Sequence, residues 1–211
     1  MQVAAEIARR LLQINAIKLQ PNEPFTWASG LQSPIYCDNR VSLSFPDVRC
    51  FVKNALAEVA RDFEPFDVVA GVATAGIPQG ALVADLLEKP FIYVRSSAKE
   101  HGRQNLIEGE LANGSRVLVI EDLISTGMSS LKAVDSLREA GAEVVGLLAI
   151  FTYGFEKADK AFSEKKVVWE ALSDYETLIQ VAVESKYIDE TDLATLKRWR
   201  ESPEQWGALY A

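Results

Sequence analysis

The sequence predicts an α/β fold in which a parallel β-sheet is covered by helices on both faces. Short, continuous apolar runs alternate with helical patterns through the middle of the chain. These runs show no regular alternation with polar residues, which is typical of strands buried on both faces. The chain has 211 residues and is 48% hydrophobic, which is enough for one domain with a sizeable core.

Strands and helices are expected to alternate from residue 66 onward. The apolar runs predict strands at residues 66–73, 90–96, 115–122, 143–154 and 167–173. The helical spacing of apolar residues predicts helices between them, at residues 76–89, 129–142 and 155–166. Gly141 stands where a helix should end, because glycine is favoured just after a helix C-terminus.

The two ends of the chain have a different pattern. Helices are expected at residues 3–15 and 46–63, and the stretch 24–43 between them mixes aromatic and turn residues, which predicts short strands and loops. The C-terminal residues predict further helices, for which the candidate N-caps are Ser173, Asp174 and Asp189. We expect a single domain over residues 1–211, with an N-terminal region at about 1–45, a core at about 46–172 and C-terminal helices at about 173–211.

The composition argues against several classes of protein. The formal net charge of −8 disfavours a general nucleic-acid or anionic-membrane binder, since both need a basic face. The longest apolar run, at residues 144–151, is far short of the ~18 residues that span a bilayer. The N-terminus has no basic region ahead of a long apolar run, so it does not look like a signal peptide. Cys37 and Cys50 form no CxxC motif and are expected to be reduced thiols of a soluble, cytoplasmic protein.

The stretch "VLVIEDLISTGMSS" (residues 117–130) carries the clearest chemical signal. The acidic pair Glu121 and Asp122 ends an expected strand, and a turn rich in hydroxyl groups then enters a helix N-terminus. Backbone N–H groups and the helix dipole favour a phosphate at such a place, and Gly127 lets the backbone approach it. The loop lacks the GK[ST] and GxGxxG patterns of nucleotide-binding loops. The alternative is a solvated strand end with a hydroxyl-rich turn.

The acidic pair is well suited to hold the ribose of a ribose 5-phosphate. Carboxylates accept hydrogen bonds from a diol, and the phosphate would lie in the adjacent loop. The pair would then lie under the anomeric carbon, where positive charge develops when a glycosidic bond breaks.

A second candidate site is the loop after the strand at residues 90–96. It contains Arg95, Lys99, His101 and Arg103, with Gly102 and Gly109 beside them, and its length is typical of a closing lid. His101 is the only histidine in the chain, and a lone histidine is more often structural or exposed. Its basic neighbours favour a contact with pyrophosphate instead.

Several segments together resemble a known family. The stretch at 117–130 resembles the ribose-phosphate (PRPP) binding motif of type I phosphoribosyltransferases, and the chain more narrowly resembles the orotate phosphoribosyltransferase family. The other matching segments are "PFTWASGLQSPIYCDNR", "GVATAGIP", "YVRSSAKEHGRQNLIEG" and "AIFTYG". The resemblance implies a type I phosphoribosyltransferase-like sheet with a small N-terminal hood. It also implies transfer of phosphoribose from PRPP to orotate in de novo pyrimidine (UMP) biosynthesis, with Mg²⁺ bound through PRPP.

The resemblance also assigns roles to residues. It implies catalytic roles for Lys99, His101 and Asp122, and a pyrophosphate loop formed by Thr74 and Ala75. Orotate would contact Ser125, Tyr36 and Cys37, with Ser29 and Gly30 nearby in the hood; a buried strand-turn-strand is the alternative for the hood segment. The PRPP-binding set would be Arg95, Lys99, His101, Glu121, Asp122, Leu123, Ile124, Ser125, Thr126, Gly127, Met128 and Ser129. In the family the lid reaches into the partner subunit, which implies a homodimer with shared active sites.

The chain departs from many relatives at four positions. Ala28, Ala75 and Ser96 stand where those relatives carry lysine, and no arginine is present near Tyr153, where some relatives have one that grips the orotate carboxylate. Two other functions stay open at this point. One is phosphoribosyl transfer to a different base, and the other is a non-catalytic regulator that senses PRPP. The C-terminal "ESPEQWGALYA" has no predicted role.

Overall fold

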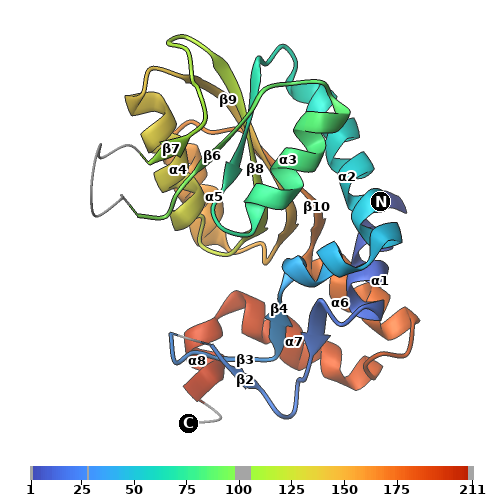
Figure 1. Cartoon of the computed structure of the whole chain (residues 1–211). Coiled ribbons are helices and arrows are strands. Elements are labelled where there is room, and N and C mark those ends of the chain that lie inside the picture. Colours follow the sequence, from blue (N-terminus) through green and yellow to red (C-terminus); the bar gives the residue numbers. More distant parts are fainter. Residues whose placement is uncertain (1, 28, 98–105, 209–211) are drawn as a thin grey trace.

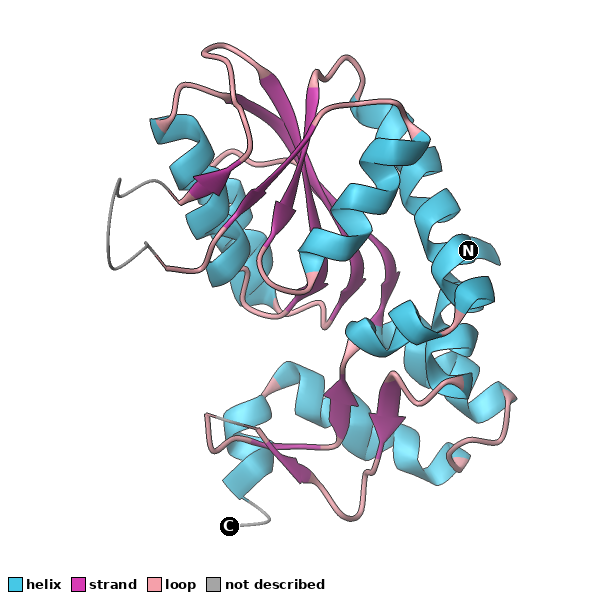
Figure 2. Cartoon of the chain, viewed as in Figure 1, coloured by secondary structure: helices cyan, strands magenta, loops and turns pink. Residues whose placement is uncertain are grey.

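The computed structural model describes residues 2–27, 29–97 and 106–208. Figure 1 shows two parts, a large α/β core and a smaller hood below it, and Figure 2 shows how helices and strands divide between them. The helices are α1 (Gln2–Gln13), α2 (Pro46–Ala60), α3 (Gly76–Leu86), α4 (Met128–Glu139), α5 (Glu156–Glu164), α6 (Tyr175–Glu184), α7 (Leu193–Glu201) and α8 (Pro203–Gly207). The strands are β1 (Ile17–Leu19), β2 (Phe25–Thr26), β3 (Gln32–Ser33), β4 (Ile35–Cys37), β5 (Val68–Val72), β6 (Phe91–Val94), β7 (Ile107–Glu108), β8 (Arg116–Ile124), β9 (Glu143–Thr152) and β10 (Trp169–Asp174).

The central sheet has the strand order β10-β9-β8-β5-β6-β7. All neighbouring strands are parallel except β6 and β7, which pair antiparallel at one edge. The five expected strands and the helices between them are therefore confirmed. The short edge strand β7 was not predicted, because two residues give no periodicity to read.

Helices cover both faces of the sheet, as expected for strands buried on both sides (Figure 1). Leu118 and Ile120 of β8 belong to a core cluster that includes buried residues of α1, α2, α3 and α6. Val117 and Val119 point to the other face and belong to a cluster with α4 and α5. Alternate residues of one strand thus pack into two separate hydrophobic layers.

The hood combines both ends of the chain. Strands β1 and β4 pair antiparallel, as do β2 and β3, and α8 packs against β3. Trp206 of α8 is buried, and its indole N–H donates to Thr195 Oγ1 at 3.0 Å. The C-terminal segment without a predicted role is therefore part of the hood, at least up to residue 208, where the described residues end.

The predicted helix N-caps are confirmed at two of three positions. Asp174 caps α6 by accepting from the backbone N–H of Thr177 at 2.8 Å. Asp189 forms a capping box with Asp192 at a short 3₁₀ turn that leads into α7. Ser173 was wrongly predicted as a cap. It is buried inside β10, and its hydroxyl donates instead to the carbonyl of Ala4 at 2.9 Å.

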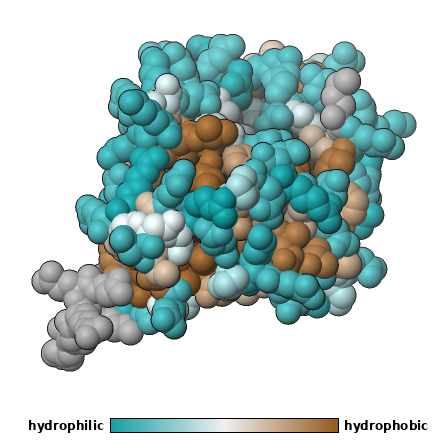
Figure 3. All heavy atoms as spheres, turned by 90° about the horizontal axis from the view of Figure 1, so that it is seen from above, coloured by the Kyte–Doolittle hydropathy of each residue, from teal (hydrophilic) through white to brown (hydrophobic). Residues whose placement is uncertain are grey.

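The face seen from above in Figure 3 is largely hydrophilic, with apolar patches between the polar side chains. Large apolar side chains that are exposed in the described residues include Leu86, Met128 and Val168. None of the described helices is both long and apolar enough to span a membrane.

Candidate active site

The site lies between β5 and β8, where successive strands are added to opposite sides of the sheet. The chain passes from β5 through α3 to β6 on one side, and β8 then pairs with β5 on the other side. Ligands of open α/β sheets bind at the carboxyl ends of the strands at such a switch point. The loop after β5 carries Thr74 and Ala75, and the end of β8 carries the acidic pair. The structure therefore brings these two predicted segments together.

Glu121 and Asp122 lie within β8 and not after its end, which corrects the expected boundary at residue 122. The last pairing of β8 with β5 is between Ile120 and Gly71, whereas its pairing with β9 continues to Ile124 and Thr152. Among the described residues, β9 is therefore the only strand that pairs with this stretch of β8. The other edge of β8 is contacted there by groups outside the sheet, among them the start of α3 at Gly76.

Glu121 is almost fully buried, with 4% of its surface exposed. Its carboxylate accepts from the Ser130 hydroxyl at 2.9 Å and from the Asp122 backbone N–H at 3.1 Å. Burial, followed by the charge of Asp122, raises the pKa of Glu121 to about 8. Burial also raises the pKa of the Asp122 carboxyl above its ordinary value. Near neutral pH the pair therefore carries less than two full negative charges.

The predicted phosphate loop runs from Ser125 to the start of α4. Gly127 has φ +77° and precedes the first residue of the helix, Met128. A Cβ atom at Gly127 would lie 2.7 Å from the ring of Phe162, so a side chain has no room there. Met128 and Ser129 are exposed at the helix N-terminus, where backbone N–H groups are free to bind an anion.

The pyrophosphate loop predicted at Thr74 and Ala75 leads directly into α3. A Cβ atom at Gly76 would lie 2.6 Å from the backbone carbonyl of Ile120, so only glycine lets α3 begin this close to β8. The N-terminus of α3 therefore lies next to the acidic pair. Its positive dipole end faces the region where a pyrophosphate group would carry negative charge.

The predicted base site is a cavity of about 340 Å³ between core and hood. Tyr36, Cys37 and Ser125, the three predicted orotate contacts, all line it. Burial, followed by the charges of Asp122 and Asp38, raises the pKa of the Cys37 thiol well above its ordinary value. Cys37 is therefore a neutral thiol, which presents no charge to a ligand.

Two aromatic residues of the base cavity were not predicted. Trp27 and Tyr153 line it, and their rings stack with centroids 5.4 Å apart. The Trp27 indole N–H donates to the carbonyl of Ile35 at 3.0 Å, which holds the ring in place. Both residues are evidently aromatic in the sequence, but they are 126 positions apart, and no local pattern predicts that they line the same cavity.

The lid is described only at its two ends. Lys99 and His101 lie outside the described residues, and their predicted roles stay predictions. Arg95 lines a cavity of about 470 Å³ together with Ala73 and Ser129, next to both predicted phosphate-binding loops. Arg95 Nη1 lies 3.6 Å from a carboxylate oxygen of Glu108, and this nitrogen is buried without a hydrogen-bond partner among the described residues.

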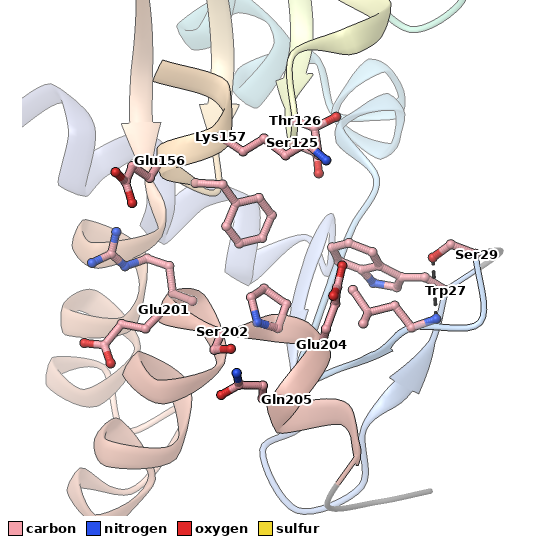
Figure 4. A pocket seen from close by; sticks show the side chains of 14 residues that line it. Trp27, Ser29, Ser125, Thr126, Glu156, Lys157, Glu201, Ser202, Glu204 and Gln205 are labelled. Carbon is pink, nitrogen blue, oxygen red and sulfur yellow. Dashed lines mark hydrogen bonds between the residues drawn. The ribbon is translucent and has the colours of Figure 1, made fainter. Parts of the chain in front are cut away.

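A third cavity, of about 540 Å³, adjoins the base cavity and shares Trp27 and Ser125 with it. Ser29, one of the predicted hood residues, also lines it, whereas Gly30 does not. Two cations that were not predicted, Lys157 and Arg200, contribute to its wall. Figure 4 shows the Lys157 side chain extending toward Ser125 and Thr126.

Comparison with known proteins assigns this chain to a family. The family described as "Phosphoribosyl transferase domain" matches residues 49–186. An orotate phosphoribosyltransferase of Listeria innocua is 56% identical over 98% of this chain and 100% of its own length. The chain belongs to the orotate phosphoribosyltransferase family.

Solved structures of the family have the same fold. The orotate phosphoribosyltransferase of Aeropyrum pernix is 29% identical, with a TM-score of 0.75 over 86% of this chain and 99% of its own. The Mycobacterium tuberculosis enzyme in complex with PRPP is 25% identical, with a TM-score of 0.66 over 83% of this chain and 98% of its own. The match to these relatives covers nearly their full length, and it confirms both the predicted fold class and the predicted family.

The structure shows what occupies the positions that depart from many members of the family. Ala75 is the N-cap of α3 and Ser96 is exposed after β6, while Ala28 lies outside the described residues. Tyr153 is buried in an aromatic cluster with Trp27, Phe155 and Trp199. Tyr153 therefore contributes an aromatic wall to the base cavity.

Proposed function

We infer that this protein transfers the phosphoribosyl group of PRPP to orotate, giving orotidine 5'-monophosphate and pyrophosphate in pyrimidine biosynthesis. The observation that carries this inference is the identity of more than half of all residues to orotate phosphoribosyltransferases along the whole chain. In the reaction, the bond from C1 of the ribose to the pyrophosphate oxygen breaks, and pyrophosphate leaves with the electron pair. N1 of orotate, which gives up its proton to solvent, forms the new bond to C1.

The residues of this chain support that reaction mainly by position and charge. The acidic pair holds the ribose hydroxyls and lies under C1, where positive charge builds as the bond breaks. The loop at residues 125–129 holds the 5'-phosphate, and the α3 N-terminus faces the pyrophosphate. The base cavity holds orotate between Tyr36, Cys37 and Ser125, within reach of C1. Arg95, Lys99 and His101 neutralise the pyrophosphate as it leaves.

Magnesium is the cofactor that we propose. Carboxylate, phosphate and water oxygens are the ligands Mg²⁺ prefers, and Asp122 and Glu121 offer carboxylate oxygens at the ribose position. Because burial raises the pKa of both groups, the pair is a weak magnesium site by itself, and oxygens of the pyrophosphate and ribose would supply most ligands. Bound there, Mg²⁺ would neutralise part of the charge on the leaving group.

The choice of base is tested by measuring pyrophosphate release from PRPP with a panel of bases. Orotate should support magnesium-dependent release, whereas adenine, guanine and uracil should not, because the relatives that share more than half of their residues with this chain are orotate phosphoribosyltransferases. Turnover of a purine at the rate of orotate would point to phosphoribosyl transfer to another base. Tight PRPP binding without release for any base would point to a PRPP-sensing regulator.

Lys157 is our candidate for the group that binds the orotate carboxylate. Its exposed side chain extends toward Ser125, which lines both the base cavity and the larger cavity beside it (Figure 4). No ion pair between Lys157 and a carboxylate occurs among the described residues, so its charge is available for a ligand. Lys157 lies in α5, whereas Tyr153 follows the end of β9.

Replacing Lys157 by glutamine should raise KM for orotate roughly tenfold, which corresponds to about 1.4 kcal/mol, and leave KM for PRPP unchanged. Lys160→Gln is the matched control, since Lys160 lies on the same helix and pairs with Glu156 at 2.9 Å. A higher KM for PRPP with an unchanged KM for orotate would assign Lys157 to the 5'-phosphate instead.

A homodimer with shared sites and a cytoplasmic location complete the proposal. The lid joins β6 to β7, which lie at one edge of the sheet, and we propose that it acts in the active site of a second copy of the chain. Cys37 and Cys50 are both free thiols, in line with a reducing compartment.

A further inference from the structure

Asn39 makes an unusual connection between the hood and the ribose site. It is 1% exposed and begins the 3₁₀ turn Asn39–Ser44 that follows β4. Its side-chain amide Nδ2 donates to the backbone carbonyl of Asp122 at 2.8 Å, across 83 positions of sequence. In the part of the chain that the structure describes, no strand pairs with β8 on the β5 side beyond Ile120. The Asn39 amide therefore supplies to Asp122 a donor that a neighbouring strand would otherwise provide.

Asn39 takes part, through its side chain and its backbone carbonyl, in a longer chain of buried polar contacts. The Cys37 thiol lies 3.6 Å from Asn39 Oδ1, so the base cavity connects to one end of the amide. The Ser42 hydroxyl donates to the backbone carbonyl of Asn39 at 2.6 Å, and Gln79 Nε2 of α3 donates to the same hydroxyl at 3.4 Å. The chain thus links a residue of the base site, the acidic pair, and the helix that follows the pyrophosphate loop.

We propose that Asn39 is a positioning residue for the phosphoribosyl transfer, acting by holding the Asp122 main chain so that its carboxylate faces the ribose. This inference rests on the proposed function. A carboxylate that stabilises developing charge must be held within a fraction of an ångström, and no described strand supports β8 on its β5 side at this point. Asparagine fits this role because its amide NH₂ donates to the Asp122 carbonyl while its amide oxygen accepts from the Cys37 thiol.

The test is a double-mutant cycle in kcat. Asn39→Leu keeps the approximate volume and removes the donor, and it should lower kcat about tenfold with little change in KM for orotate. In an Asp122→Asn background the same replacement should lower kcat less than about twofold, because the carboxylate that Asn39 positions is already gone. Equal losses in both backgrounds, or a raised KM for orotate with unchanged kcat, would overturn the proposal.

Two further variants keep the test decisive. Ser173→Ala also removes a buried hydrogen bond from a side chain to a backbone carbonyl, but on the outer strand β10, which β9 separates from β8, so it should lower Tm and leave kcat unchanged. If Asn39→Leu does not fold, Ser42→Ala takes its place, with a kcat loss of roughly threefold that also vanishes in the Asp122→Asn background. Should wild-type protein not use orotate at all, the proposed function fails, and the cycle is run with the base that it does use.

Discussion

Replacing Asp122 by asparagine is expected to lower kcat by about a hundredfold or more, because a preorganised charge that faces a developing cation is worth ~3 kcal/mol in the transition state. The replacement keeps the shape of the side chain and removes only the negative charge. Steady-state kinetics with orotate and PRPP measure the effect. KM for PRPP should change much less than kcat, since the charge of the ribose develops only as the bond breaks.

A matched control is available at the other end of the same strands. Asp67 precedes β5 and pairs with Arg116 of β8 at 2.6 Å, so Asp67→Asn also removes a carboxylate from this pair of strands. It should leave kcat unchanged. If Asp122→Asn instead raised KM for PRPP and left kcat intact, Asp122 would bind the ground state only, and its catalytic role would be wrong.

Mixing two inactive variants is expected to restore activity. Lys99→Ala and Asp122→Asn chains should each be nearly inactive as homodimers. In a mixed dimer one site combines both defects and the other has neither, provided that Lys99 acts in the partner's site. Random exchange at equal amounts makes about half of the dimers mixed, each with one intact site, so roughly a quarter of wild-type activity should return.

The mixing experiment has an internal control. Native mass spectrometry shows whether subunits exchange, and a chain carrying both replacements, mixed with either single variant, should recover nothing. If exchange occurs and activity stays absent with the two single variants, the lid acts within its own subunit. The shared active site would then have to be abandoned.

The core could be predicted because its signal is local. Five apolar runs between helical patterns indicated the central sheet, and the order strand, acidic pair, hydroxyl loop and helix indicated the ribose-phosphate site. Each signal depends on residues that are neighbours in sequence. The extension of β8 to Ile124 was missed because a pair of acidic residues reads as a strand end. Pairing with β9, which no local pattern reveals, carries the strand past them.

The rest depends on contacts between distant segments. Three features depend on residues that are far apart in the chain. They are the packing of α8 on β3, the stacking of Trp27 on Tyr153, and the hydrogen bond from Asn39 to Asp122. Lys157 was passed over because a lysine in the first turn of an amphipathic helix reads as a solvated surface residue. Its relation to Ser125 is a property of the packed structure (Figure 4).

The construction of the hood from both chain ends has a consequence for the order of events during synthesis. Strands β1–β4 leave the ribosome early, but the Trp27 ring packs against Trp199 of α7, and β3 packs against α8. These partners are made only after the whole sheet. The α/β core can therefore collapse while the nascent chain is still growing, whereas the hood can reach its final packing only when translation is nearly complete.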